Sequence, residues 1–186
     1  MIDRTNEYKL QRRVAGYHDI RLDGLTDIVL RAKGKRVLDL GCNRGLIGFE
    51  MANNGATLVH GCDNFEPGIN VARELFIDLR SVESAFAVTD LTQAFPFEKQ
   101  QYDIVLMIAT YHKLKRVMPA GDLTKLIKNL GDRCTEYFVW RGNGDNREAA
   151  EEMVNLDRDL APAFTRVHTT TISKTLGLAA IWERAA

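Results

Sequence analysis

Residues 36–56, RVLDLGCNRGLIGFEMANNGA, decide the fold. Within them, VLDL is an apolar run that is too short for a helix and is closed by glycine, so it predicts a buried strand. Residues 46–54 then repeat apolar side chains at helical spacing, and Gly55 ends this helix because glycine readily adopts the left-handed conformation found after helices. Glycines placed in this way are typical of a chain that brings its backbone close to a small ligand.

Strand and helix patterns alternate along the remainder of the chain. Further strands are expected at residues 57–63, 84–90, 102–109 and 136–140, with a closing antiparallel hairpin at residues 164–172 and 176–184. Helices are expected after Pro67, at residues 123–130 and at residues 146–160, while residues 1–33 are helical but irregular. Strands that alternate with helices form a mostly parallel sheet covered on both faces. The chain is therefore expected to be an α/β protein.

The composition is that of an ordinary globular domain. The chain has 186 residues, of which 45% are hydrophobic and 27% charged, and we interpret it as a single domain. Residues 1–33 form its N-terminal segment and residues 34–186 its core. Twenty-five basic residues balance twenty-five acidic ones, which does not support a general affinity for nucleic acid. The N-terminus lacks the apolar core of a signal peptide and no apolar run reaches about 18 residues, so a cytoplasmic protein without membrane contact is expected.

Cysteine and histidine spacing predicts no metal site. Cys42, Cys62 and Cys134 are odd in number and widely spaced, which fits reduced thiols better than disulfides or zinc. Cys42 and Cys62 are interpreted as packing residues, because neither has a visible base partner. His60 and His168 fall inside strand patterns, where a packed histidine is expected.

Three successive strands carry aspartate at their carboxyl ends: Asp39, Asp63 and Asp90. In a parallel sheet these ends share one edge, where ligands of such folds bind. Asp63 follows Asp39 by twenty-four residues, close to the spacing of about 20 at which an acid binds ribose hydroxyls in this architecture. Two other interpretations stay open, namely a glycine turn that binds nothing and three solvated strand ends. A shared site explains the three acids together.

The spacing of the glycine loop also distinguishes between ligands. A dinucleotide site needs G-x-G-x-x-G, so that backbone amides hold a pyrophosphate. The loop here is D-L-G-C-N-R-G, with Asn43 where the second glycine of that motif would stand. This loop favours a nucleoside that carries a small zwitterion over a pyrophosphate.

VLDLGCNRG, GCDNFEPGINVAREL, VTDL and YDIVLMIATYHKL together resemble the class I S-adenosylmethionine-dependent methyltransferases. The resemblance covers almost the whole chain from Lys35, and it implies a Rossmann-like three-layer sandwich with a mostly parallel seven-stranded sheet and S-adenosyl-L-methionine as cofactor. It further implies that Asp39 and the glycine loop hold the methionine part, Asp63 the ribose, and Asp90 with Leu91 the adenine. The implied cofactor-binding residues are Asp39, Gly41, Cys42, Asn43, Gly45, Asp63, Asn64, Asp90, Leu91, Ile108 and Ala109.

The sequence departs from the family pattern at two positions. Asn43 replaces a glycine of the usual loop, which is tolerable because asparagine adopts left-handed backbone angles more readily than most residues. Asn64 stands where the family commonly has an apolar residue against adenine, and Phe65 is expected to supply that contact instead.

Methyl transfer demands no fixed catalytic residue. The reaction is an in-line displacement from an activated donor, so positioning of the acceptor supplies much of the acceleration, and a base is needed only if the acceptor must lose a proton. Tyr111 and His112, in an expected loop at residues 110–113, are the candidate catalytic residues. The alternatives are a solvent-facing histidine and a tyrosine packed beneath the next helix. Three further polar residues follow the fifth strand at the same edge of the sheet: Arg141, Asn143 and Asp145.

The acceptor is constrained mainly by what the chain lacks. The fourth strand is not followed by the Asp/Asn-Pro-Pro-aromatic motif of methylases that act on exocyclic amines of adenine and cytosine. Only one helix is expected between the fourth and fifth strands, so material for a lid is confined to the N-terminal segment. That segment contains Tyr8, Tyr17 and His18 together with the basic residues Arg4, Lys9, Arg12, Arg13 and Arg21. It is interpreted either as a cover over an anionic or small polar substrate or as a solvated helix face.

The leading hypothesis is methyl transfer from S-adenosylmethionine to an oxygen or nitrogen atom of a small polar acceptor. A nucleic acid or protein acceptor stays open. The alternative from another class is a non-catalytic S-adenosylmethionine-binding or partner-regulating module of the same fold. A nicotinamide-dependent oxidoreductase is disfavoured by the loop spacing, and fold alone decides none of these.

Overall fold

The computed structural model describes residues 20–97, 99–142, 144, 146–173 and 177–186. Their strands form one seven-stranded sheet in the order β3-β2-β1-β4-β5-β7-β6. These strands are β1 (Arg36–Leu40), β2 (Leu58–Asp63), β3 (Glu83–Val88), β4 (Tyr102–Ile108), β5 (Cys134–Arg141), β6 (Phe164–Ser173) and β7 (Gly177–Arg184). Strands β1 to β5 are parallel, and β7 is antiparallel to both β5 and β6. The predicted Rossmann-like α/β sheet with its closing hairpin is confirmed.

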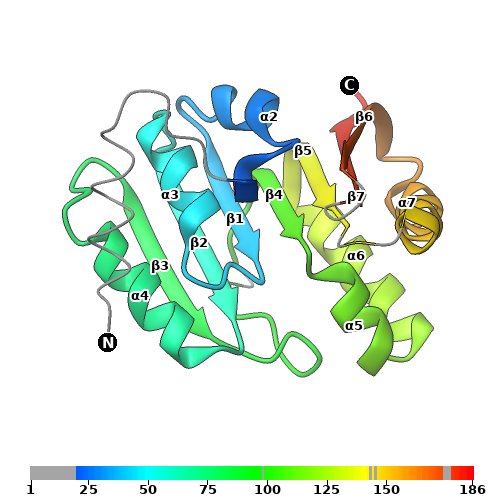
Figure 1. Cartoon of the computed structure of the whole chain (residues 1–186), viewed down its shortest axis with the longest axis horizontal. Helices are drawn as coiled ribbons and strands as arrows, with labels where there is room; N and C mark the ends of the chain where they lie inside the picture. The colour runs from blue at the N-terminus through cyan, green and yellow to red at the C-terminus, as the bar shows by residue number, and fades with distance from the viewer. Residues whose placement is uncertain (1–19, 98, 143, 145, 174–176) are drawn as a thin grey trace.

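Helices cover both faces of the sheet (Figure 1). On one face, an apolar core is completed by α2 (Thr26–Leu30), α3 (Leu46–Asn53) and α4 (Glu66–Phe76), with the short 3-10 helix η1 (Ile20–Leu22) ahead of them in the chain. On the other face, a second core is completed by α5 (Tyr111–Val117), α6 (Ala120–Arg133) and α7 (Asn146–Leu160). Successive side chains of a strand point to opposite faces, so Val37 belongs to the first core and Leu38 to the second. The three layers match the prediction.

The order of the strands reverses between β1 and β4. From β1 the chain builds outward through β2 to β3, then crosses back to place β4 on the other side of β1. The loops that leave β1 and β4 therefore face each other across this point. In open α/β sheets, such a point is where the crevice for a ligand forms.

One helix was expected between β4 and β5, and this prediction is wrong. Residues 110–113, expected as a loop, instead begin α5, and α6 follows after Pro119. The break lies where Pro119 disfavours a helical conformation for Met118, which is extended. Tyr111 and Leu114 stabilise the additional helix, because both are buried in the second core.

The structure also tests two strand histidines and one tryptophan. His60 is partly buried in β2, where its Nδ1 lies 2.8 Å from the hydroxyl of Tyr102, and Trp140 is fully buried as expected. The packed interpretation of His168 is wrong, because β6 is an edge strand and leaves its side chain exposed. The possible lid residues Tyr8, Tyr17 and His18 lie outside the described residues. In the part of the chain that is described, no helix has the length and apolar character to cross a membrane.

Candidate functional site

The glycine loop after β1 depends on left-handed backbone angles. Gly41, Asn43 and Gly45 have φ angles of 71°, 50° and 70°. A side chain at Gly41 would collide with the hydroxyl of Thr110, and a Cβ at Gly45 would lie 2.8 Å from that of Ala72. Asn43 thus adopts a left-handed backbone angle, which asparagine tolerates better than most residues. The loop is thus pressed against both the start of α5 and the side of α4.

Asp63 fixes the same loop from the neighbouring strand. Its Oδ2 accepts a hydrogen bond of 2.9 Å from the backbone amide of Asn43. Its Oδ1 accepts another of 2.9 Å from the amide of Phe65. Each carboxylate oxygen can accept a further bond, so Asp63 is held in one orientation and can still bind two hydroxyl groups of a ligand.

Asp39 is a buried carboxyl group with unused hydrogen-bonding capacity. It is 2% exposed, and its Oδ2 has no hydrogen-bond partner among the described residues. Burial raises the pKa of Asp39 to about 7, and the nearby charge of Asp63 acts in the same direction, against the opposing effects of the Gly48 amide and Arg141. A cationic group that reached Oδ2 would restore the ionised form.

Asp90 has the opposite electrostatic setting. Its Oδ1 accepts hydrogen bonds of 2.9 Å from the backbone amide of Thr92 and 2.8 Å from the hydroxyl of the same residue. These bonds hold the pKa of Asp90 below its usual range. Asp90 therefore carries a negative charge after β3 at neutral pH, whereas Asp39 is about half protonated there.

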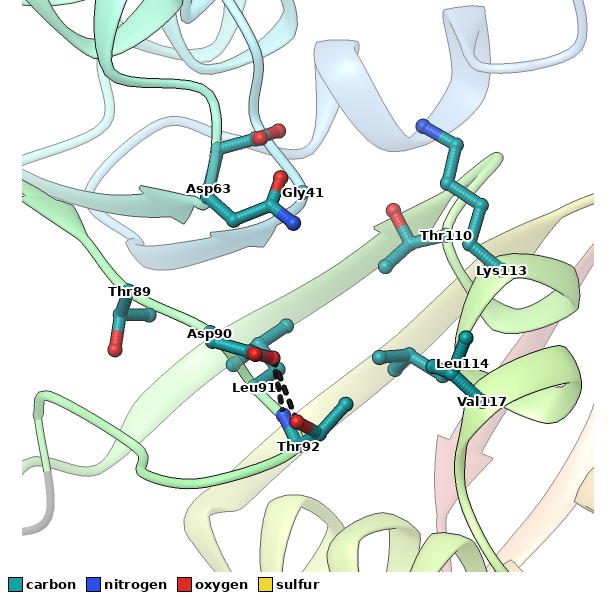
Figure 2. Close-up of a pocket in the computed structure, with 11 residues that line it drawn as sticks. Gly41, Asp63, Thr89, Asp90, Leu91, Thr92, Thr110, Lys113, Leu114 and Val117 are labelled. Atoms are coloured by element: carbon teal, nitrogen blue, oxygen red, sulfur yellow. Dashed lines mark hydrogen bonds between the residues drawn. The ribbon is translucent and has the colours of Figure 1, made fainter.

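A cavity of about 190 Å³ lies between the carboxyl ends of β2, β3 and β4, and we call it the aspartate cavity. Figure 2 shows Asp63 and Asp90 on one side of it, with Thr110, Lys113 and Leu114 on the other. Leu91, Leu114 and Val117 supply its apolar surface. Two acids beside an apolar wall suit a ligand that combines a flat ring with polar hydroxyl or amino groups.

A second cavity of about 270 Å³ adjoins it, and we call it the basic cavity. Gly41 and Lys113 line both cavities. Either volume alone falls short of the roughly 300–1,000 Å³ typical of small-molecule sites, so a ligand of that size would have to occupy both cavities. The residues that line the basic cavity include Asp39, Cys42, Asn43, Ile108 and Ala109 and the basic residues Arg21, Arg44, Lys113 and Arg141.

Ala109 departs from ordinary backbone geometry. Its φ angle is 51°, in the left-handed region that alanine rarely adopts. Its amide donates a hydrogen bond of 2.8 Å to the carbonyl oxygen of Arg141, which helps to hold the turn between β4 and α5. Strained residues of this kind are concentrated at functional sites, and this one lines the basic cavity.

Ten of the eleven predicted cofactor-binding residues line one of the two cavities. The exception is Gly45, which instead caps the start of α3 and packs against Ala72. Asn64 lines the aspartate cavity, while the neighbouring Phe65 does not.

Sequence reasoning missed several residues of the site. Leu114 and Val117 have the i, i+3 spacing of a helix face, but this signal was lost because α5 was not expected. Thr92 follows Asp90 by two residues, the spacing of a local side-chain turn. Arg44 was named only as part of the loop motif, although its side chain lines the basic cavity.

The candidate catalytic residues Tyr111 and His112 lie in the first turn of α5 and line neither cavity. Tyr111 is 2% exposed and packs in the second core, which matches the packed alternative, and burial raises its pKa to about 12. His112 is 8% exposed, so the solvent-facing alternative is wrong. The Nδ1 of His112 has no hydrogen-bond partner among the described residues. Burial lowers the pKa of His112, and the nearby positive charge of Lys113 lowers it further.

Of the polar residues predicted after β5, the structure describes Arg141. Its side chain is buried at the end of β5, where one guanidinium nitrogen donates hydrogen bonds of 2.5 Å and 3.2 Å to the carbonyl oxygens of Arg21 and Asp23. Arg141 thus fixes the segment before α2 beside the basic cavity. Asn143 and Asp145 lie outside the described residues.

Comparison with known proteins is consistent with this geometry. A family model described as "Methyltransferase domain" matches residues 37–132. An O-antigen chain terminator bifunctional methyltransferase/kinase of Escherichia coli is 30% identical over 118 residues, which is 60% of this chain and 16% of that protein. A ubiquinone biosynthesis O-methyltransferase of Neisseria meningitidis is 33% identical over 107 residues, or 55% of this chain and 42% of that protein. The chain therefore spans less than half of either relative.

Solved structures share the fold over nearly the whole chain. Magnesium protoporphyrin IX methyltransferase from Synechocystis, with bound S-adenosylhomocysteine, aligns with a TM-score of 0.65 at 18% identity, covering 97% of this chain and 94% of that one. An N-methyltransferase from Bradyrhizobium japonicum, in complex with S-adenosylhomocysteine, aligns with a TM-score of 0.64 at 15% identity, covering 96% and 98%.

Proposed function

This chain belongs to the class I S-adenosylmethionine-dependent methyltransferases, and from that membership we propose that it transfers a methyl group from S-adenosylmethionine to an oxygen or nitrogen atom of a small polar acceptor. One observation supports the proposal. Asp63 and Asp90 line one cavity and Asp39 lines the other, and both cavities are lined by Gly41 and Lys113. The relatives' names support an oxygen or nitrogen atom as the acceptor, since they include an O-methyltransferase of ubiquinone biosynthesis and an N-methyltransferase.

The aspartate cavity suits the adenosine part of the cofactor. Asp63, oriented by two backbone amides, would accept the ribose hydroxyls. Asp90 would accept a hydrogen bond from the adenine amino group. Leu91, Leu114 and Val117 would pack against the ring, whose apolar faces match their side chains.

The basic cavity suits the methionine part. Asp39 would pair with the ammonium group, since its Oδ2 is buried without a partner among the described residues. Backbone groups of Gly41, Cys42 and Asn43 would meet the carboxylate. Gly45 would act by shaping the loop, and Ile108 with Ala109 would line the remaining wall.

The bound cofactor would supply an electrophilic methyl group on a sulfonium, and the protein would hold the acceptor in line with that group. An acceptor entering beside Lys113, where the two cavities meet, would be aligned for in-line attack without any required base. For an acceptor that must lose a proton, His112 is the candidate base, because Tyr111 is packed in the second core and burial raises its pKa to about 12. His112→Gln tests this role: a general base predicts a loss of about 100-fold or more in kcat, whereas a packing residue predicts a change in stability alone.

The test of the proposed function is calorimetric titration with S-adenosylmethionine, S-adenosylhomocysteine and NAD. We expect micromolar binding of the first two, abolished in Asp63→Ala and retained in Asp132→Ala, which removes an exposed carboxylate of α6. Thermal unfolding of each variant checks that the fold persists. Binding of NAD alone, or of no ligand, would overturn the proposal.

A second candidate function is a module that binds the cofactor without turning it over. The observation that favours it is that Tyr111 and His112 line neither cavity. Formation of S-adenosylhomocysteine in the presence of small polar acceptors would decide for the enzyme. Tight binding with no product across hydroxyl, amine and carboxyl acceptors would decide for the module.

A further inference from the structure

Basic side chains outnumber acidic ones among the described residues that line the basic cavity. Four basic side chains, Arg21, Arg44, Lys113 and Arg141, line it. Asp39 is the only acid among the described residues of its lining. Burial raises the pKa of Asp39 to about 7, so in the unliganded protein at neutral pH this carboxyl group is half protonated and offsets only part of one positive charge.

The four basic side chains differ in their partners. Arg141 donates to backbone carbonyl oxygens and so has a structural task. Arg44 and Lys113 make no side-chain hydrogen bond or ion pair with any residue that the structure describes. Lys115, two positions further along α5, does pair with Glu151 at 3.0 Å. The side chains of Arg44 and Lys113 are thus available at the cavity.

Arg44 and Lys113 come from two different segments of the chain. Arg44 belongs to the glycine loop after β1, and Lys113 to the first turn of α5 after β4. Lys113 also lines the aspartate cavity (Figure 2). The strand order makes β1 and β4 neighbours, so the segments that follow them bring both cations to the lining of the basic cavity.

Bound S-adenosylmethionine would not neutralise this charge. Its ammonium and carboxylate groups cancel each other, while its sulfonium adds one positive charge. A neutral or cationic acceptor would leave the charges of Arg44 and Lys113 to be solvated by water alone. An oxyanion would pair with both, and arginine is especially suited to carboxylate and phosphate groups.

We therefore propose that the methyl acceptor carries a carboxylate or phosphate group, which Arg44 and Lys113 bind in the basic cavity. This inference rests on the proposed function and narrows its substrate class. Binding of the oxyanion would anchor the acceptor and leave its nucleophilic atom facing the junction of the two cavities. Arg44 and Lys113 are accordingly specificity-determining residues.

The experiment uses the full chain saturated with S-adenosylhomocysteine. Inorganic phosphate and acetate are titrated separately at constant ionic strength, with binding followed by the shift in melting temperature and by calorimetry. We expect saturable binding of at least one anion, and the stronger of the two identifies the group. Arg44→Gln and Lys113→Gln should each weaken it by roughly 10-fold, the effect of one charge-assisted hydrogen bond. Lys128→Gln, which removes an exposed lysine of α6, should have no effect.

The outcomes separate this inference from the proposed function. Failure of the wild-type chain to bind S-adenosylhomocysteine would contradict the proposed function itself. Normal cofactor binding with no anion binding, or with equal anion binding in all variants, would overturn the oxyanion proposal alone. Loss of S-adenosylhomocysteine affinity in Arg44→Gln and Lys113→Gln, with anion affinity unchanged, would also overturn it and reassign both residues to the cofactor.

Discussion

The carboxylate of Asp63 accepts a hydrogen bond of 2.9 Å from the backbone amide of Asn43, tying the end of β2 to the glycine loop that follows β1. A residue assigned to the ribose of a ligand is therefore also a structural support for the loop beside it. The loop is held in turn against α5, because Gly41 packs on Thr110. The end of β2 and the start of α5 thus both hold the glycine loop after β1, and substitutions at these contacts should change the stability of the protein.

Replacing Asn43 with glycine should cost little stability, whereas replacing it with alanine should destabilise the protein. Its φ angle is 50°, a conformation that costs most L-residues about 1–2 kcal/mol but asparagine and glycine less. We expect Asn43→Ala to lower the free energy of unfolding by about 1 kcal/mol, and Asn43→Gly to leave it nearly unchanged. Urea unfolding measures both. Equal losses in the two variants would show that the asparagine side chain, not the backbone angle, is what the loop requires.

Gly41→Ala should be more damaging than an ordinary glycine substitution in the left-handed region. The new Cβ would collide with Thr110 Oγ1 and lie 3.0 Å from its Cγ2, so we expect a loss of about 2 kcal/mol beyond the backbone cost. Gly34→Ala is the matched control, because its φ angle of 77° is similar and, apart from residue 34 and its two chain neighbours, no described residue has an atom within 4 Å of the added Cβ.

A double-mutant cycle with Thr110→Ala isolates the collision. Removing Oγ1 and Cγ2 should recover part of the loss caused by Gly41→Ala but none of that caused by Gly34→Ala. Additive effects at positions 41 and 110 in urea unfolding would mean that the two residues do not press on each other.

The sheet and the acidic edge were predictable because they depend on short-range patterns. Apolar runs such as VLDL predict strands. Because parallel topology brings the carboxyl ends of strands together, Asp39, Asp63 and Asp90 could be assigned to one site from their positions alone. The helix α5 was not predictable in this way. Its seven residues hold two buried apolar side chains, Tyr111 and Leu114, too few for helical periodicity to emerge.

Other features of the site depend on contacts between distant segments. The bond from Asn43 to Asp63 requires the register of β1 and β2, and the presence of Arg44 and Lys113 at one cavity requires β4 to lie beside β1. No local pattern encodes either relationship. The burial that moves the pKa of Asp39 is likewise a property of the assembled layers.

Asp39 should make the stability of the unliganded protein decrease with pH. Its pKa rises from 3.8 to about 7 on folding, so the folded state binds more protons than the unfolded state between these values. This contribution is fully present below about pH 4, is lost as the pH rises towards 7, and is absent above it. Each pKa unit corresponds to about 1.4 kcal/mol, so we expect a loss of about 2–3 kcal/mol between pH 5 and pH 8.

Asp39→Asn should remove this slope, because the amide does not titrate. Asp90→Asn is the control: Thr92 holds the pKa of Asp90 below its usual range, so Asp90 stays ionised from pH 5 to pH 8 and its replacement should leave the slope unchanged. Urea unfolding at both pH values gives the comparison. A wild-type slope identical to that of Asp39→Asn would show that Asp39 is already ionised at pH 5.

Binding of S-adenosylhomocysteine should release a proton from Asp39. The proposed function places the ligand's ammonium group on the buried Oδ2, which has no hydrogen-bond partner among the described residues. A cation at that position favours the ionised carboxylate and lowers its pKa. With a pKa of about 7 in the free protein, Asp39 is half protonated at pH 7, so about half a proton should leave for each ligand bound.

Calorimetry in buffers of different ionisation enthalpy measures the number of protons released directly. The release should grow at pH 6, vanish at pH 8.5 and be absent in Asp39→Asn. Binding without any proton release at pH 7 would mean that the ammonium group does not lie on Asp39, and that the methionine part of the cofactor is held by other residues of the basic cavity.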